Sequence, residues 1–221
     1  MVPQKYQKRL AEAMSELSLD SFMISNVIFS VGGVHLVETT KVPAMAWTDG
    51  EGIYLNVKYI DEVVLDELQI KEFTVPMIMY TIAHEAMHLI NFTLARKKEH
   101  NYNHMLWNFA TDYAINSLLV NNTRNGKKAP IGAYIKGTLY DDKYLNKSSD
   151  EIYEDLKQDF INQVKQQLQQ QGQMPKKQQG QGSGSSQQQE NGESEGFPQP
   201  SMGIDPNDDL GQELKKLLGD D

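Results

Sequence analysis

The stretch TVPMIMYTIAHEAMHLINFTLAR, residues 74–96, decides the fold. Thr74 suits the N-cap of an α-helix and Pro76 suits its first turn, and neither glycine nor a further proline follows before residue 96. Apolar residues cover a broad surface of this segment, which predicts a largely buried helix over residues 75–96. They are Ile78, Met79, Ile82, Ala83, Ala86, Leu89, Ile90 and Leu94.

Within this predicted helix, residues 84–88 read His-Glu-Ala-Met-His. Two histidines four residues apart lie on one helix face, so both imidazoles can bind one Zn²⁺. The glutamate next to them can then take a proton from a bound water. We predict that His84 and His88 are metal ligands and that Glu85 is a general base. The structural alternative is a pair of core histidines hydrogen-bonded to carbonyl groups, with Glu85 in a salt bridge.

A catalytic zinc site needs a third protein ligand, and the chain has no cysteine to supply it. Residues 106–120 form a second apolar helix pattern, in which Asn108, Asp112 and Asn116 make a polar stripe at four-residue spacing. An antiparallel partner helix would bring this stripe back to the histidines. We predict Asp112 as the third ligand, with Asn108 and Asn116 as outer residues that orient the ligands by hydrogen bonds.

Histidine remains the alternative to Asp112. His104, and behind it His100, fall in the polar stretch 97–104, which predicts a loop. Peptide hydrolysis also needs a group that stabilises the developing oxyanion. Tyr102, His104 and Tyr113 are the candidates, and the sequence does not choose among them.

Several segments together resemble a known family, the metallopeptidase domain that precedes a von Willebrand factor A-like domain in bacterial and phage proteins. Residues 107–116, WNFATDYAIN, are similar to its tryptophan–aspartate signature, and residues 84–88 to its zinc motif. Residues 43–56 resemble its strand pair, and residues 139–156 resemble the segment that closes the domain. The resemblance covers about residues 19–156 and implies a zinc peptidase. A glutamine-rich tail follows here in place of the A-like domain.

Composition divides the chain into three parts. Residues 1–162 contain helix patterns at both ends, over 3–18 and 149–162, and strand patterns at 33–40 and 43–57. We expect this part to be one α+β domain of zincin-like fold, with strand 53–57 at a sheet edge that pairs with an extended substrate. Residues 163–204 are rich in Gln, Gly and Ser, which predicts disorder, with the alternative that helix 149–162 runs on into the first glutamines. Residues 205–221 predict a short amphipathic helix.

The charge of the chain limits its partners. A net charge of −9 without a basic cluster argues against nucleic acid. The chain lacks the run of about 18 apolar residues that a membrane span needs and the apolar core of a signal peptide, so we expect a cytoplasmic protein. The C-terminal helix is a candidate docking motif for a separate A-like-domain protein or an ATPase.

Together these patterns predict a zinc metallopeptidase with one Zn²⁺ and a protein or peptide substrate. The alternative is a catalytically silent, zinc-stabilised binding module that recruits partners through its C-terminal tail. Glu85 argues against that alternative, because a structural zinc needs no general base and usually has four protein ligands. A fourth ligand such as His104 would favour it. Hydrolysis of a non-peptide substrate is a third reading.

Overall fold

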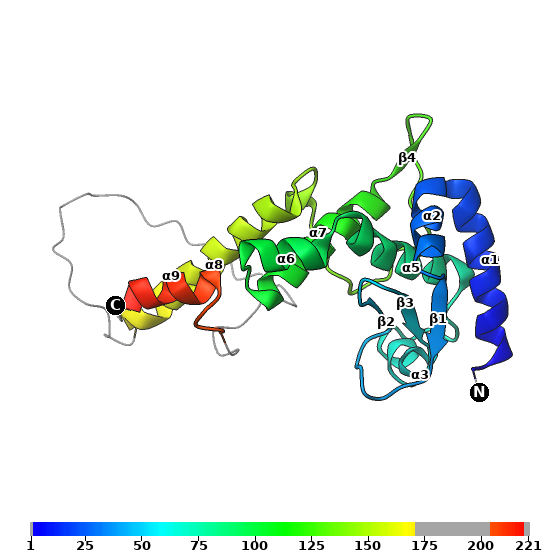
Figure 1. The fold of residues 1–221 in the computed structure, drawn as a ribbon, viewed down its shortest axis with the longest axis horizontal. Helices are drawn as coiled ribbons and strands as arrows, with labels where there is room; N and C mark the ends of the chain where they lie inside the picture. Colours follow the sequence, from blue (N-terminus) through cyan, green and yellow to red (C-terminus); the bar gives the residue numbers. More distant parts are fainter. Residues whose placement is uncertain (1, 171–203, 219–221) are drawn as a thin grey trace.

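A computed structural model describes residues 2–170 and 204–218 of the chain. The small sheet and the first helices lie at one end, and the helices of the second half extend away from them (Figure 1). None of the helices in the described parts is long and apolar enough to cross a membrane. In chain order the elements are α1 (Gln4–Asp20), α2 (Phe22–Ser30), β1 (Val34–Val37), β2 (Ala46–Thr48), β3 (Ile53–Asn56), α3 (Val57–Tyr59), the π-helix η1 (Ile60–Val64), α4 (Leu65–Glu67), α5 (Val75–Ile90), α6 (Thr93–His100), α7 (His104–Val120), β4 (Thr123–Arg124), β5 (Lys127–Lys128), the 3₁₀-helix η2 (Asp142–Tyr144), α8 (Ser149–Gln170) and α9 (Asp209–Leu218).

The three-stranded sheet has the order β1-β3-β2. Strand β3 pairs in parallel with β1 and antiparallel with β2. The turn between β2 and β3 is closed by Asp49, whose carboxylate accepts the N–H groups of Glu51 and Gly52. The prediction that strand 53–57 lies at a sheet edge is therefore wrong, because β3 is paired on both sides. The edge strand next to α5 is β2.

Helix α5 is the buried centre of the first core and packs against α1, α2, β2 and α7. It is shorter than the predicted helix over residues 75–96, because the chain turns at Phe92, which has a left-handed backbone with φ 51°. The Thr93 hydroxyl donates to the carbonyl of His88 and closes this turn. The polar stretch 97–104, predicted as a loop, instead ends α6 and begins α7.

Helix α7 joins two separate apolar cores. Its C-terminal half, with Ile115 and Leu119, packs into the first core beside α5. Its N-terminal half, with Leu106 and Trp107, packs into a second core formed with α8. Asp112 lies between these two halves. The helix that carries the predicted third ligand is thus held firmly at both ends.

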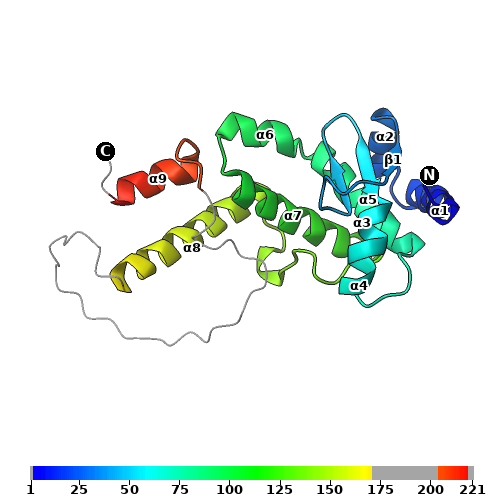
Figure 2. The same cartoon turned by 90° about the horizontal axis from the view of Figure 1, so that it is seen from below.

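The C-terminal helix α9 runs beside α8 and closes the second core (Figure 2). Leu210 and Leu214 are buried there. The Asp209 carboxylate accepts hydrogen bonds from the Tyr153 hydroxyl and from the Lys157 ammonium, the latter at 3.2 Å. The apolar face that was expected to dock a partner therefore packs within this chain.

Part of the glutamine-rich segment that was predicted to be disordered is helical. Helix α8 continues past the expected end at residue 162 to Gln170. Residues 171–203, the rest of that segment, lie outside the described residues.

Docking of α9 predicts a measurable contribution to stability. Leu214→Ala should lower the free energy of unfolding by about 2–4 kcal/mol, because it removes a side chain that is 7% exposed from the second core. Leu218→Ala is the matched control, since Leu218 lies on the same helix and is 48% exposed. Urea unfolding of both variants would measure the difference. Equal effects of the two substitutions would mean that α9 is not docked.

Candidate metal centre

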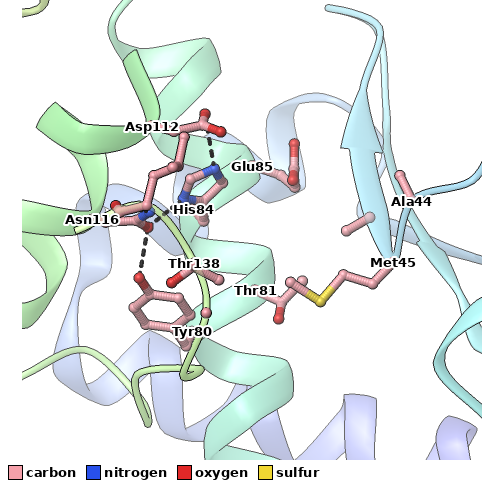
Figure 3. A pocket seen from close by; sticks show the side chains of 12 residues that line it. Ala44, Met45, Tyr80, Thr81, His84, Glu85, Asp112, Asn116 and Thr138 are labelled. Atoms are coloured by element: carbon pink, nitrogen blue, oxygen red, sulfur yellow. Dashed lines mark hydrogen bonds and ion pairs between the residues drawn. The ribbon is translucent and has the colours of Figure 1, made fainter. Parts of the chain in front are cut away.

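Helices α5 and α7 bring His84, His88 and Asp112 together. The Nε2 atoms of the two histidines are 3.1 Å apart. The Oδ1 atom of Asp112 is 3.5 Å from Nε2 of His84 and 3.2 Å from Nε2 of His88. Among the described residues, these three side chains form the group able to hold a metal ion. Figure 3 shows Asp112 facing His84 across the space between the two helices.

The spacing of these three donor atoms suits a small divalent cation. Ligands ~2.0–2.1 Å from a tetrahedral metal such as zinc are ~3.3 Å from one another, close to the three distances here. Two imidazole nitrogens and a carboxylate oxygen are also a donor set that zinc and several other divalent ions accept. Their lone pairs repel at this range unless a proton or a metal ion lies between them.

Asn116 fixes the tautomer of His84. Its amide nitrogen donates to the carbonyl of Leu139 at 2.8 Å, so its Oδ1 atom is left as an acceptor. This oxygen accepts the Tyr80 hydroxyl at 2.6 Å and lies 2.8 Å from Nδ1 of His84 (Figure 3). Nδ1 of His84 therefore carries a proton in either charge state, so Nε2 is the nitrogen that faces Asp112 and can bind a metal once its own proton is displaced.

Thr93 fixes the tautomer of His88 in a similar way. Its hydroxyl donates to the carbonyl of His88, so its oxygen can accept a hydrogen bond from Nδ1 of His88, 3.3 Å away. The carbonyl of Thr93 is held in turn by the indole N–H of Trp107 at 2.8 Å. Both imidazoles thus present Nε2 to the same point, as a pair of metal ligands must.

The charges of the three side chains are strongly coupled. Burial on its own lowers the pKa of His84, but the hydrogen bond and the charge of Asp112 outweigh it and raise this pKa to about 9. Burial opposes ionisation of Asp112, yet the hydrogen bonds from both histidines hold the pKa of its carboxyl well below the usual range. In the metal-free protein at neutral pH, a proton on His84 takes the place that a cation would hold.

This coupling predicts that metal binding depends on pH. Because the raised pKa keeps His84 protonated below about pH 9, an ion must displace that proton, and each ion bound at pH 7 should release about one proton. Affinity should then rise about tenfold per pH unit between about pH 6 and pH 8. Titration calorimetry in two buffers with different ionisation enthalpies would count the protons. Binding without proton release at pH 7 would contradict this coupling.

Glu85 lies on the same helix but faces the sheet. The residue is buried, 9% exposed, and its side chain is opposite Ala44 and Met45 in Figure 3. Burial raises the pKa of Glu85, while the charges of His84 and His88 and, to a smaller extent, the nearby backbone N–H of Thr48 in the edge strand β2 lower it in part. Glu85 is therefore a buried carboxylate of enhanced basicity beside the candidate metal ligands.

A cavity of about 310 Å³ gives access to these groups. It is bounded by α5, α7, the segment before and into β2, and the loop around residues 137–139. The chain just before that loop packs closely against α5 at Gly132. A side chain would not fit there, because an added Cβ would lie 2.4 Å from the carbonyl oxygen of Pro76. The next residue, Ala133, donates its N–H to the same carbonyl at 2.9 Å. The cavity thus has a rigid wall on each side.

The structure brings only some of the predicted site residues together. His84, Glu85, Asp112 and Asn116 all line the 310 Å³ cavity. Asn108 is exposed, and in the described parts of the chain its side chain forms no hydrogen bond with the others. His104 is also exposed and begins α7, eight residues before Asp112 and so about 12 Å away along the helix.

The two predicted tyrosines belong to the second core. The Tyr102 hydroxyl donates to Asp150 at 3.0 Å, and its ring stacks on Trp107. The ring of Tyr113 packs on Tyr144, with 4.7 Å between centroids. Neither residue lines the cavity beside Glu85, and neither does His104. The structure therefore places none of the three candidates for the oxyanion-stabilising group at the cleft.

Sequence reasoning missed Tyr80, Thr93 and Thr48. Tyr80 precedes His84 by four residues, as His84 precedes His88, so its place on the same helix face could have been seen. Thr93 and Thr48 act through a turn and a strand whose positions depend on long-range packing, and no local pattern marks them.

The fold and the cluster define a class: an α+β domain with a candidate metal centre and a buried carboxylate in one cleft. The chain belongs to the family described as "Putative metallopeptidase domain", whose model matches residues 5–214. The predicted family is thereby confirmed, over a range that includes α1 and part of α9. No curated protein and no solved structure is detectably similar to the chain. The family indicates a metal-dependent peptidase that acts on peptides.

Proposed function

We propose that the protein is a zinc-dependent peptidase of zincin-like fold, in which His84, His88 and Asp112 hold one Zn²⁺ and Glu85 is the general base. One observation carries this proposal: two Nε2 atoms and a carboxylate oxygen converge within 3.5 Å on the cavity that also holds Glu85. A small mixed sheet beside the metal-site helix supports the zincin-like assignment.

Each side chain has a defined task in this proposal. When bound, zinc polarises the scissile carbonyl and lowers the pKa of the attacking water towards ~7. Glu85 accepts the proton of that water and passes it to the leaving amine. Burial raises the pKa of Glu85, which makes its carboxylate a better proton acceptor. Asn116 and Thr93 keep both imidazoles in the tautomer that presents Nε2.

The geometry weighs against a structural zinc site. Such a site usually has four protein ligands, whereas the described residues supply a group of three. His104, which would favour the binding-module alternative as a fourth ligand, is too far along α7 to join them. With the described residues alone as ligands, a bound zinc would keep a position for water and substrate, as catalysis requires.

Cleavage of a peptide mixture would test the proposal. The zinc-loaded protein would be incubated with peptides from a proteome digest, and new termini would be identified by mass spectrometry. We expect cleavage that stops when a chelator removes the metal and returns when zinc is added back. A protein that holds one zinc per chain but releases no new termini would contradict the proposal.

A further inference from the structure

A second hollow adjoins the candidate metal centre. This apolar groove, of about 590 Å³, lies between α2, the turn from α5 to α6 and the tip of the β2–β3 hairpin. Met23 and Val27 line it from α2, Leu89 and Leu94 from the α5–α6 segment, and Gly50 from the hairpin. Its lining residues include no Lys, Arg, Asp or Glu. The groove thus suits an uncharged apolar group.

The rim of this groove exposes large apolar side chains. Phe92 is 70% exposed, Met23 57% and Leu94 51%. Contiguous exposed apolar surface is rare on a protein unless something binds there. The side chain of Leu94 also approaches the tip of the hairpin. A Cβ added at Gly50 would lie 3.6 Å from Cδ1 of Leu94, which is van der Waals contact. The α6 segment and the hairpin therefore enclose the groove from two sides.

Two residues connect the groove to the candidate metal centre. His88 lines the groove and presents its Nε2 atom to Asp112. Thr48 also lines the groove, and it belongs to β2, the strand that packs on α5. The groove therefore lies next to the site at which a peptide bond would be cleaved.

The cavity beside Glu85 and the groove lie one after the other along α5 and along the β2 segment. On α5, Tyr80 and His84 line the cavity, and His88 lines the groove one turn later. On the opposite wall, Ala46 lines the cavity and Gly50 the groove. One helical turn is ~5.4 Å, while two residues of an extended peptide span ~6.6 Å. A peptide that crosses the metal centre would thus place in the two hollows side chains that are two residues apart, which point to the same side of an extended chain.

We propose that the apolar groove is a specificity subsite, which selects peptides with a large uncharged side chain such as Leu, Met or Phe next to the cleaved bond. This inference rests on the proposed function and names its substrate class. The lining offers no Lys, Arg, Asp or Glu as a partner, so the groove disfavours acidic and basic side chains. The groove has a larger volume than the cavity beside Glu85, which favours a bulky side chain in the groove.

Two groove variants and one control would test this subsite by cleavage. Met23→Glu and Leu94→Glu put a charge at the groove, and both side chains are exposed enough to change without loss of the core. Phe29→Glu is the matched control, because Phe29 is 60% exposed on α2 but does not line the groove. We expect wild type to prefer bonds next to Leu, Met or Phe. Both groove variants should lower the cleavage of Leu peptides relative to Ala peptides by about tenfold or more, and the control should not.

A binding assay separates failure of this subsite from failure of the proposed function. Peptides Gly-Ser-Gly-Xaa-Gly-Ser-Gly, with Xaa as Ala, Leu, Phe or Glu, would be titrated into zinc-loaded Glu85→Gln protein and followed by NMR. Stronger binding of the Leu and Phe peptides, lost in Leu94→Glu, would support the subsite even if wild type cleaves nothing. Equal binding of all four peptides, or binding unchanged by Leu94→Glu, would overturn it and leave the groove as a surface for another protein.

Discussion

Glu85→Gln should remove nearly all peptide cleavage while the protein still binds its metal. The amide keeps the size of the carboxylate, but it cannot take a proton from water. Loss of a general base lowers rates by about 10²–10⁴-fold. Because Glu85 is not one of the three converging donors, metal content should not change. Cleavage rates and metal content of the same preparation would measure both effects.

Glu99→Gln is the matched control for this variant. It changes the net charge by the same amount at an exposed position on α6. Its cleavage rate should equal that of wild type. If Glu85→Gln cleaved as fast as this control, another group would have to be the base. If Glu85→Gln lost its metal, then Glu85 would be a ligand instead.

Asp112→Ala should weaken metal binding more than any other change on α7. The substitution removes one of three donor atoms, and it also removes the charge that stabilises the imidazole pair. Replacing a residue that only orients a ligand costs about 10–100-fold in affinity. We expect Asn116→Ala to fall in that range and Asp112→Ala to exceed it. Competition with a chromophoric zinc chelator would give the affinities.

The control for this series is Asn108→Ala. Asn108 lies four residues before Asp112 on the same helix but is exposed. Its substitution should leave affinity unchanged, so the expected order of loss is Asp112, then Asn116, then Asn108. Metal binding that survives in Asp112→Ala but is lost in His104→Ala would show that the third ligand had been misassigned.

Much of the candidate site could be predicted because its residues recur at helical spacing. His84 and His88 are one turn apart on a single helix, and Asp112 and Asn116 repeat that spacing on another. The same four-residue spacing also predicted that Asn108 orients a ligand, but Asn108 is exposed. Four residues exceed one helical turn by ~40°, so Asn108 and Asn116 point ~80° apart, on either side of Asp112. Only Asn116 faces α5, and a polar stripe read from sequence does not reveal this rotation.

The features that were not predicted depend on contacts between distant segments. The sequence indicated strands in the right places, but β3 is central because β1 pairs with its second edge, across a connection of 15 residues between β1 and β3. The short helix near the C-terminus was recognised from its amphipathic pattern, whereas its packing on α8 depends on Asp209 meeting Tyr153 and Lys157. Helix α2, which lines the apolar groove, was not predicted.

Anomalous X-ray diffraction at the zinc edge, from crystals of the zinc-loaded protein, tests the central claim most directly. We expect one strong peak in each chain, about 2.0–2.2 Å from Nε2 of His84, Nε2 of His88 and a carboxylate oxygen of Asp112. The Glu85 carboxylate should lie beside the metal without binding it. A crystal with bound zinc but no peak between these three side chains, or a peak ligated by His100 or His104 instead, would contradict the account.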